Sequence, residues 1–381
     1  MSTLPLTAFK RLVIKIGSSL LIARNGAELR TDWLSSLAGD IAALKARGME
    51  IVVVSSGAVL MGRRALGLNA RTLSLDKLQA AASVGQIDLN QAWRNALAKH
   101  NVTIGQILIT PNITEERRYY LNARTTINTL LALGAVPIIN ENDSVVTSEI
   151  RYGDNDRLSA RVAVMIEADA LVILSDVDGL YTAPPGKSDN MKHIPVVKQV
   201  TPEIEAMAGG AASHFSRGGM TTKIEAAKIA TMAGTAMFIA KGSDLSPLGA
   251  LALGGKHTFF AASQTPKAAR KRWISGTLEV AGEIHIDAGA ATALRNGKSL
   301  LPIGVTRIKG AFSRGDAIAI YAPDGEEMAR GLASMSFEDA NLAKGKKSQA
   351  IIGMFGAENR TELVHADDLA LSSSGFGETN E

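Results

Sequence analysis

The amino-acid sequence predicts an α/β protein with a mostly parallel open sheet sandwiched by helices, followed by a small C-terminal β-barrel-like domain. Two observations predict the first part: short continuous apolar runs recur along the chain, and helical stretches separate them. Continuous runs are typical of strands covered on both faces, and strand–helix alternation is typical of parallel sheets. The third observation is frequent glycine between short alternating segments after residue 276, which predicts the β-rich domain.

Six apolar runs are the candidate strands of the first domain. They cover residues 12–16, 51–54, 104–109, 136–139, 171–174 and 236–239. Between the first two we expect a helix, because Leu34, Leu37 and Ile41 recur at helical spacing. Thr31 or Asp32 is the expected N-cap, and Gly48 is the expected end.

The chain has 381 residues, which suits two domains. We expect a catalytic domain over residues 1–263, a basic linker over 264–276, a β-rich domain over 277–371 and a disordered tail over 372–381. The run at 12–16 indicates a buried strand rather than a signal peptide, because Lys15 interrupts it.

Composition excludes several classes of protein. The sequence has no cysteine, so disulfides, thiolate metal sites and cysteine nucleophiles are ruled out, and a cytoplasmic location is expected. An apolar fraction of 46% permits a sizeable core and argues against global disorder. No apolar run is long enough for a membrane span. A net charge of +4 is too small to argue by itself for nucleic-acid binding.

Lys15 and Ser56 each lie where a predicted strand ends. Lys15 is followed by Gly17 and Ser18, so an ammonium group, backbone amides and a hydroxyl are available to a phosphate. Ser56 lies in a small turn after the second strand, and parallel sheets bind ligands where strands end. Taken singly, each segment is equally explained by a tight turn or a solvated lysine.

A glycine turn at 218–219 precedes an alanine-rich helical segment. Lys223 falls in the first turn of that helix, where a cation is unfavourable unless an anion is bound. The surrounding sequence is not a Walker A loop, and the glycine-rich and H-R-D motifs of protein kinases are also missing.

Acidic and amide side chains gather after two later strands. Asp143 follows the strand at 136–139, and Asp154, Asn155 and Asp156 come soon after it. These side chains are suited to fix an α-ammonium group. Ser175 and Asp176 follow the strand at 171–174, where contact with a nucleotide or Mg²⁺ is expected. Asx-rich turns that cap a helix are the plainer alternative.

Together, these segments resemble the amino-acid kinase superfamily and, within it, the glutamate 5-kinase family. The matching segments are KIGSSLL, VSSGAVLMG, LNARTTINTLL, INENDSVV, YGDNDRLSARVA, LSDVDGLYT and GGMTTKIEAA. The C-terminal segments AGEIHIDAGAATALRNGKSLLPIGV and GAFSRGDAIAIY resemble a PUA domain.

The resemblance implies an amino-acid kinase fold and ATP-dependent phosphorylation of the γ-carboxylate of L-glutamate, the first step of proline biosynthesis. It implies that Lys15 and Lys223 contact the transferring phosphoryl group and that Ser56, Asp143 and Asn155 bind glutamate. Asp154 and Asp156 would belong to the substrate loop or its Mg²⁺ network. The implied ATP-binding residues are Lys15, Gly17, Ser18, Ser175, Asp176, Arg217, Gly218, Gly219, Met220, Thr221, Thr222 and Lys223.

The resemblance also implies feedback inhibition by proline and a homodimer or homotetramer. Two alternatives remain open at this point. One is another superfamily member that acts on a different carboxylate or phosphate. The other is an RNA-binding or RNA-modifying protein that acts through its PUA-like domain, although aromatic residues for base stacking are scarce there.

Overall fold

The computed structural model describes residues 5–23, 28–70, 73–110, 117–145, 155–183, 191–208, 219–276, 280–356 and 361–372. The chain forms two compact units, which divide between Pro266 and Lys267. Four expected features lie outside the described residues: Asp154, Arg217, Gly218 and nearly all of the predicted tail.

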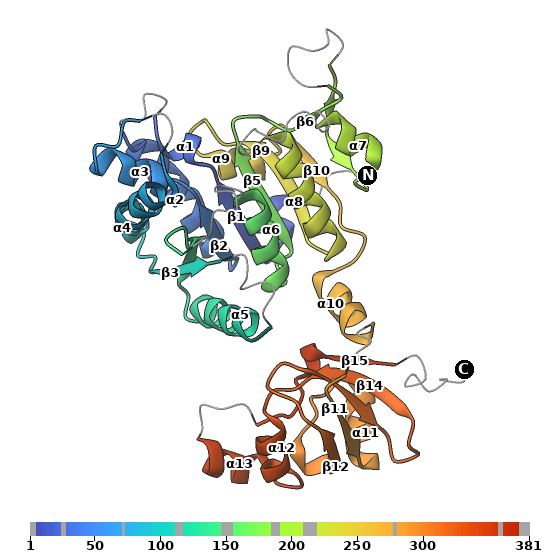
Figure 1. Cartoon of the computed structure of the whole chain (residues 1–381). Coiled ribbons are helices and arrows are strands. Elements are labelled where there is room, and N and C mark those ends of the chain that lie inside the picture. The colour runs from blue at the N-terminus through green and yellow to red at the C-terminus, as the bar shows by residue number, and fades with distance from the viewer. Residues whose placement is uncertain are drawn as a thin grey trace. The chain divides into compact units, whose positions relative to one another are not determined.

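The first unit contains an eight-stranded sheet among the described residues, in the order β3-β4-β2-β1-β5-β9-β10-β8 (Figure 1). The six strands from β3 to β9 pair in parallel, and β10 runs antiparallel to β9. The strands are β1 (Arg11–Ile16), β2 (Glu50–Ser55), β3 (Ile104–Ile109), β4 (Val136–Glu141), β5 (Ala170–Ser175), β8 (Val196–Val197), β9 (Ala236–Lys241) and β10 (His257–Phe260). The predicted mostly parallel sheet is confirmed, and each of the six predicted strands falls inside an observed one.

Helices cover both faces of this sheet. They are α1 (Ser18–Leu21), α2 (Thr31–Ala46), α3 (Ala58–Ala65), α4 (Leu75–Ala98), α5 (Arg117–Ala132), α6 (Asn155–Met165), α7 (Pro202–Met207), α8 (Met220–Met232) and α9 (Pro247–Ala252). A separate hairpin pairs β6 (Leu180–Tyr181) with β7 (His193–Ile194).

The two faces of the sheet have separate cores because strand side chains alternate between faces. On β1, Leu12 and Ile14 pack with α2 and α4, whereas Val13 packs with α6 and α8 on the other face. Lys15 lies two residues beyond Val13 and therefore belongs to the α6–α8 face. Those two helices contact each other and run side by side across the sheet (Figure 1).

Two boundaries differ from the sequence-based expectation. The helix α2 begins at Thr31, but its N-cap position is Arg30 and no side chain caps it. Gly48 does end the helix region, since its φ of 80° favours glycine and its amide bonds back to Lys45. Strand β3 is not covered on both faces: only Ile109 is buried, because β3 lies at the edge of the sheet.

The second unit is built on a five-stranded sheet in the order β12-β11-β13-β14-β15. Its strands are β11 (Gly282–Ile286), β12 (Val305–Gly310), β13 (Ala317–Tyr321), β14 (Glu327–Leu332) and β15 (Leu369–Leu371), and its helices are α10 (Pro266–Ser275), α11 (Ala288–Arg295), α12 (Phe337–Ala343) and α13 (Ser348–Phe355). Short 3-10 helices occur at Leu6–Ala8 in the first unit and at Pro302–Gly304 and Ala366–Asp368 in the second.

The basic segment expected as a linker over 264–276 contains the helix α10. Ile274 on this helix is fully buried with Leu332 and Ala370 of the second unit. Arg270 also pairs with Asp368 at 2.6 Å, and both side chains are largely buried. Most of the segment is therefore part of the second unit. In the described parts of the chain, no helix is long and apolar enough to cross a membrane.

Candidate active site

The carboxyl ends of the central parallel strands bring the predicted site residues to one edge of the sheet. Lys15 lies at the end of β1, Ser56 directly follows β2, and Ser175 ends β5. Ser56 is placed by the turn into α3, where Gly57 has a φ of 122° that a residue with a side chain rarely adopts. The helices α6 and α8 both begin near this edge.

Three ionised side chains form a buried cluster on the α6–α8 face. Lys15 Nζ lies 2.6 Å from Asp156 Oδ1, and Lys223 Nζ lies 3.2 Å from Asp156 Oδ2. Thr222 donates a hydrogen bond of 2.8 Å to Asp156 Oδ2. The side chains of Lys15, Asp156 and Lys223 are only 9%, 1% and 5% exposed. One carboxylate thus holds the two lysines together from either side.

The protonation of Asp156 reflects its two partners. Burial opposes ionisation of this carboxyl, but the ammonium groups of Lys15 and Lys223 outweigh that effect and hold its pKa below the usual range. These three side chains consequently carry one excess positive charge in a place with little water. Two buried ammonium groups that meet at one carboxylate are suited to bind the anionic oxygens of a phosphate.

A second cluster is uncharged and starts at the neighbouring residue of α6. Asn155 Nδ2 donates to Ser56 Oγ at 2.6 Å and to Asn140 Oδ1 at 3.1 Å. Asn140 Nδ2 in turn donates to Gln86 Oε1 on α4 at 2.8 Å. Asn155 and Asn140 are 4% and 3% exposed. The site therefore has adjacent charged and amide parts.

Asp143 lies beyond the end of β4 and is 9% exposed. Burial raises its pKa to about 6, well above that of an exposed aspartate. A carboxylate that is hard to ionise gains from a nearby cation, so an incoming ammonium group is a favourable partner.

The remaining predicted residues lie around these clusters. Gly17 is the N-cap of the short helix α1, and Ser18 is the first residue of that helix. Ser175 is buried and donates to the carboxylate of Asp176 at 3.0 Å. Gly219 is the N-cap of α8, and Met220, Thr221 and Thr222 form its first turn together with Lys223.

Sequence reasoning did not single out two residues of the amide part. Asn140 is the last residue but one of β4 and begins the polar run there, so its place at a strand end was an available signal. Gln86 lies in the middle of α4, where a glutamine has no local signal of function.

No group of three acidic or histidine side chains in the described residues is arranged to hold a metal ion. Both oxygens of Asp156 already face lysines. Mg²⁺ in kinases is held largely by substrate phosphates and water, with one or two carboxylates, so a protein-only cage is not required.

Comparisons with known proteins agree on the family. The amino acid kinase family matches residues 10–241, and the PUA domain matches residues 282–355. The chain is 56% identical to a glutamate 5-kinase of Agrobacterium fabrum over 370 residues, which are 97% of this chain and 95% of that protein. It is 57% identical to glutamate 5-kinase 1 of Rhizobium meliloti, over 96% of this chain and 93% of that protein.

Similarity also extends to a glutamate 5-kinase of Sinorhizobium fredii, at 56% identity over 99% of this chain and 96% of that protein. Among solved structures, a carbamate kinase from Giardia lamblia bound to AMP-PNP is 19% identical, with a TM-score of 0.48, over 68% of this chain and 100% of that one. With a matching family model over most of its length and relatives this similar along nearly all of it, the chain belongs to the amino acid kinase family and groups there with the glutamate 5-kinases.

Proposed function

We infer that this chain transfers the γ-phosphoryl group of ATP to the γ-carboxylate of L-glutamate, giving ADP and L-glutamyl 5-phosphate for proline biosynthesis. The observation that carries this function is 56% identity to glutamate 5-kinases over 97% of the chain. The two-part site supports it, because two buried ammonium groups close together suit a phosphoryl group and an amide cluster beside them suits an amino acid.

The γ-carboxylate of glutamate is ionised at neutral pH, so the reaction needs no general base. A carboxylate oxygen attacks the γ-phosphorus, and the bond from that phosphorus to the bridging oxygen breaks, leaving ADP. Such transfers are catalysed mainly by positioning and electrostatic stabilisation. We propose that Lys15 and Lys223 contact the transferring group, while Asp156 keeps their ammonium groups converged.

For the acceptor, we propose that Ser56, Asp143 and Asn155 bind glutamate. Asn155 uses its amide N–H groups on Ser56 and Asn140, so its Oδ1 is available to accept from the α-ammonium group. Ser56 accepts from Asn155 and keeps its own O–H for a carboxylate.

On the nucleotide side, we propose that Gly17, Ser18, Ser175, Asp176 and the start of α8 contact ATP. Mg²⁺ bound to ATP would supply charge neutralisation at the phosphates. Asp154, Arg217 and Gly218 keep their predicted roles, since they lie outside the described residues.

Trapping the product with hydroxylamine tests the function. The full chain with ATP, Mg²⁺ and L-glutamate is expected to form glutamyl hydroxamate, and with aspartate or N-acetylglutamate it is not. Equal hydroxamate formation from aspartate would instead favour another member of the family.

Proline is proposed as a feedback inhibitor that competes with glutamate, because both ligands present an α-amino and an α-carboxylate group. Full activity in millimolar proline would exclude this. A homodimer or homotetramer is also proposed, and light scattering of the full chain measures it. The cytoplasmic location stays a prediction.

RNA is a proposed partner of the second unit, alongside rather than in place of the kinase activity. The rings of His285 and Tyr321 stack with their centroids 5.2 Å apart. Glu283 pairs with both His285 and Lys309, so a lysine lies close to the stacked rings. An aromatic surface with a cation is suited to bases and phosphates. Binding of RNA by the full chain that weakens steeply with salt would support it.

A further inference from the structure

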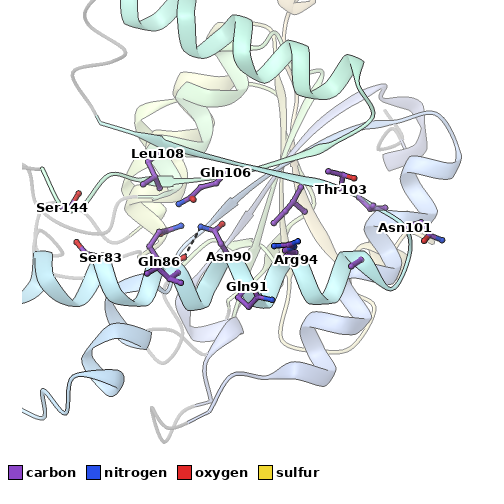
Figure 2. Close-up of a pocket in the computed structure, with 14 residues that line it drawn as sticks. Ser83, Gln86, Asn90, Gln91, Arg94, Asn101, Thr103, Gln106, Leu108 and Ser144 are labelled. Carbon is purple, nitrogen blue, oxygen red and sulfur yellow. Dashed lines mark hydrogen bonds between the residues drawn. The ribbon is translucent and has the colours of Figure 1, made fainter.

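Gln86 connects the proposed glutamate site to a groove on the outer side of the first unit. The groove has a volume of about 1020 Å³ and lies between α4 and the edge strand β3. Figure 2 shows Gln86 and Asn90 along α4, opposite Gln106 and Leu108 of β3. Gln86 is nevertheless only 9% exposed, and its side-chain oxygen is directed inward to Asn140.

The hydrogen bonds that link Gln86 to the proposed substrate-binding residues share one donor-to-acceptor direction, and Gln86 is the final acceptor. Gln86 Oε1 accepts from Asn140, whose own Oδ1 accepts from Asn155. If the Asn140 amide turned over, its N–H groups would face those of Asn155 and its oxygen would face that of Gln86. Buried amides without partners are costly, so the oxygen of Gln86 selects one orientation of Asn140.

The position of Gln86 is itself held by close packing of α4 on the turn that carries Ser56. A side chain on Gly85 would place its Cβ 1.9 Å from the carbonyl oxygen of Ala58, so the two helices meet there backbone to backbone. Further along α4, Trp93 Nε1 donates to Ser55 Oγ at 3.0 Å. These contacts fix the backbone of α4 at Gln86 relative to the turn that carries Ser56.

We propose that Gln86 is a positioning residue for the amino-acid substrate. Its oxygen orients the amide of Asn140, and Asn140 in turn orients the amide of Asn155. In this orientation the oxygen Oδ1 of Asn155, and not its Nδ2, faces the α-ammonium group. Gln86 thereby contributes to the preference for a free amino group without touching the substrate. This inference rests on the proposed glutamate site.

The test replaces Gln86 by methionine, which has a similar length and lacks the acceptor oxygen. Loss of one buried hydrogen bond between neutral amides, worth about 1 kcal/mol, predicts a KM for glutamate raised about fivefold. The KM for ATP and kcat are expected to stay within about twofold, because the charged cluster does not contact Gln86.

Glutarate, which is glutamate without the amino group, separates positioning from general damage. As an inhibitor competing with glutamate, it is expected to bind Gln86→Met and wild type equally. The ratio of its Ki to the KM of glutamate therefore falls about fivefold in Gln86→Met. A merely structural defect would weaken both ligands together.

Gln91→Met is the matched control, since Gln91 lies on α4, lines the same groove and bonds only to Asn95 among the described residues. Gln86→Glu keeps an acceptor oxygen and is expected to retain the wild-type preference for glutamate over glutarate. Should Gln86→Met not fold, Gln86→Asn shortens the side chain out of reach of Asn140 and is expected to lower the same ratio.

An unchanged ratio in Gln86→Met, or in Gln86→Asn should Gln86→Met not fold, would overturn the proposal, and so would the same change in Gln91→Met. Failure of the proposed function is a separate result, because wild type itself would then give no glutamyl hydroxamate.

Discussion

The two parts of the site differ in the kind of interaction that organises them, although they are anchored by consecutive residues. Asp156 belongs to the charged part and draws in Lys15 and Lys223, whereas Asn155 belongs to the amide part and bonds to Ser56 and Asn140. The first turn of α6 therefore separates them, because consecutive helical residues point in different directions.

This difference indicates that the two parts of the site have separate tasks in phosphoryl transfer to a carboxylate. Charge gathered by one buried aspartate favours the anionic phosphoryl group, but it gives little directional selection among acceptors. Oriented amides carry no net charge. They select the substrate that receives the phosphoryl group by the positions of its hydrogen-bond donors and acceptors. The comparison predicts that changes in the charged part alter kcat and stability, while changes in the amide part alter the KM for glutamate.

The largest expected effect is that of Asp156→Asn. Removing the carboxylate leaves two buried ammonium groups without their shared partner, and breaking such a pair costs about 3–5 kcal/mol. We expect a clear fall in the free energy of unfolding, measured with urea, together with loss of turnover. Asp88→Asn on the exposed side of α4 is the control and should leave the urea midpoint unchanged.

Lys223→Ala is expected to lower kcat by about 10²–10³, since it removes one of the two cations that we propose to contact the transferring group. The KM for glutamate should change little. Lys228→Ala on the same helix, where the lysine pairs with Glu205 in an exposed position, is the control. The assignment of Lys223 is falsified if its variant keeps near-normal kcat in the hydroxamate assay.

Ser56→Ala is expected to raise the KM for glutamate about tenfold, with the KM for ATP unchanged. The change removes a hydroxyl that accepts from Asn155 and that we propose to donate to the substrate, and hydrogen bonds to charged groups are worth about 1.5–3 kcal/mol. Initial rates at varied glutamate and at varied ATP distinguish the two constants. An equal rise in the KM for glutamate and the KM for ATP would contradict the separate roles of the charged part and the amide part.

The smallest effect concerns pH. Burial raises the pKa of Asp143 to about 6, so protons compete with the substrate ammonium group as pH falls through that value. With this pKa, kcat/KM for glutamate should fall about fourfold from pH 7 to pH 5.5, where the glutamate side chain is still ionised. The profile of Asp143→Asn should lack this step, at a lower plateau. A wild-type profile that stays level over this range would rule out the role of Asp143.

Much of the fold follows from local sequence. The central strands are predictable because each is a continuous apolar run bounded by turn residues, and Gly48 marks the end of α2. The short strands β8 and β10 are not predictable in this way, because two to four residues carry no reliable period. The exposure of β3 was also missed, since only the order of strands shows which one lies at the edge.

The candidate site likewise contains residues that the sequence predicts and residues that it does not. Lys15, Ser56 and Ser175 are recognisable because polar residues at the ends of apolar runs are unusual. Lys223 is recognisable from its place at a helix start. The link from Gln86 to Asn140 joins positions 54 residues apart and has no signature in either segment.

By itself, the sequence determined which segments are strands and which polar residues stand at their ends, because these properties depend on neighbouring residues. Only the tertiary structure decided that Asp156 lies between two lysines and that Asn155, one residue earlier, joins the amides. Those contacts depend on strand order and helix rotation, which arise when the two cores of the sheet pack. The same packing places Gln86 behind Asn140.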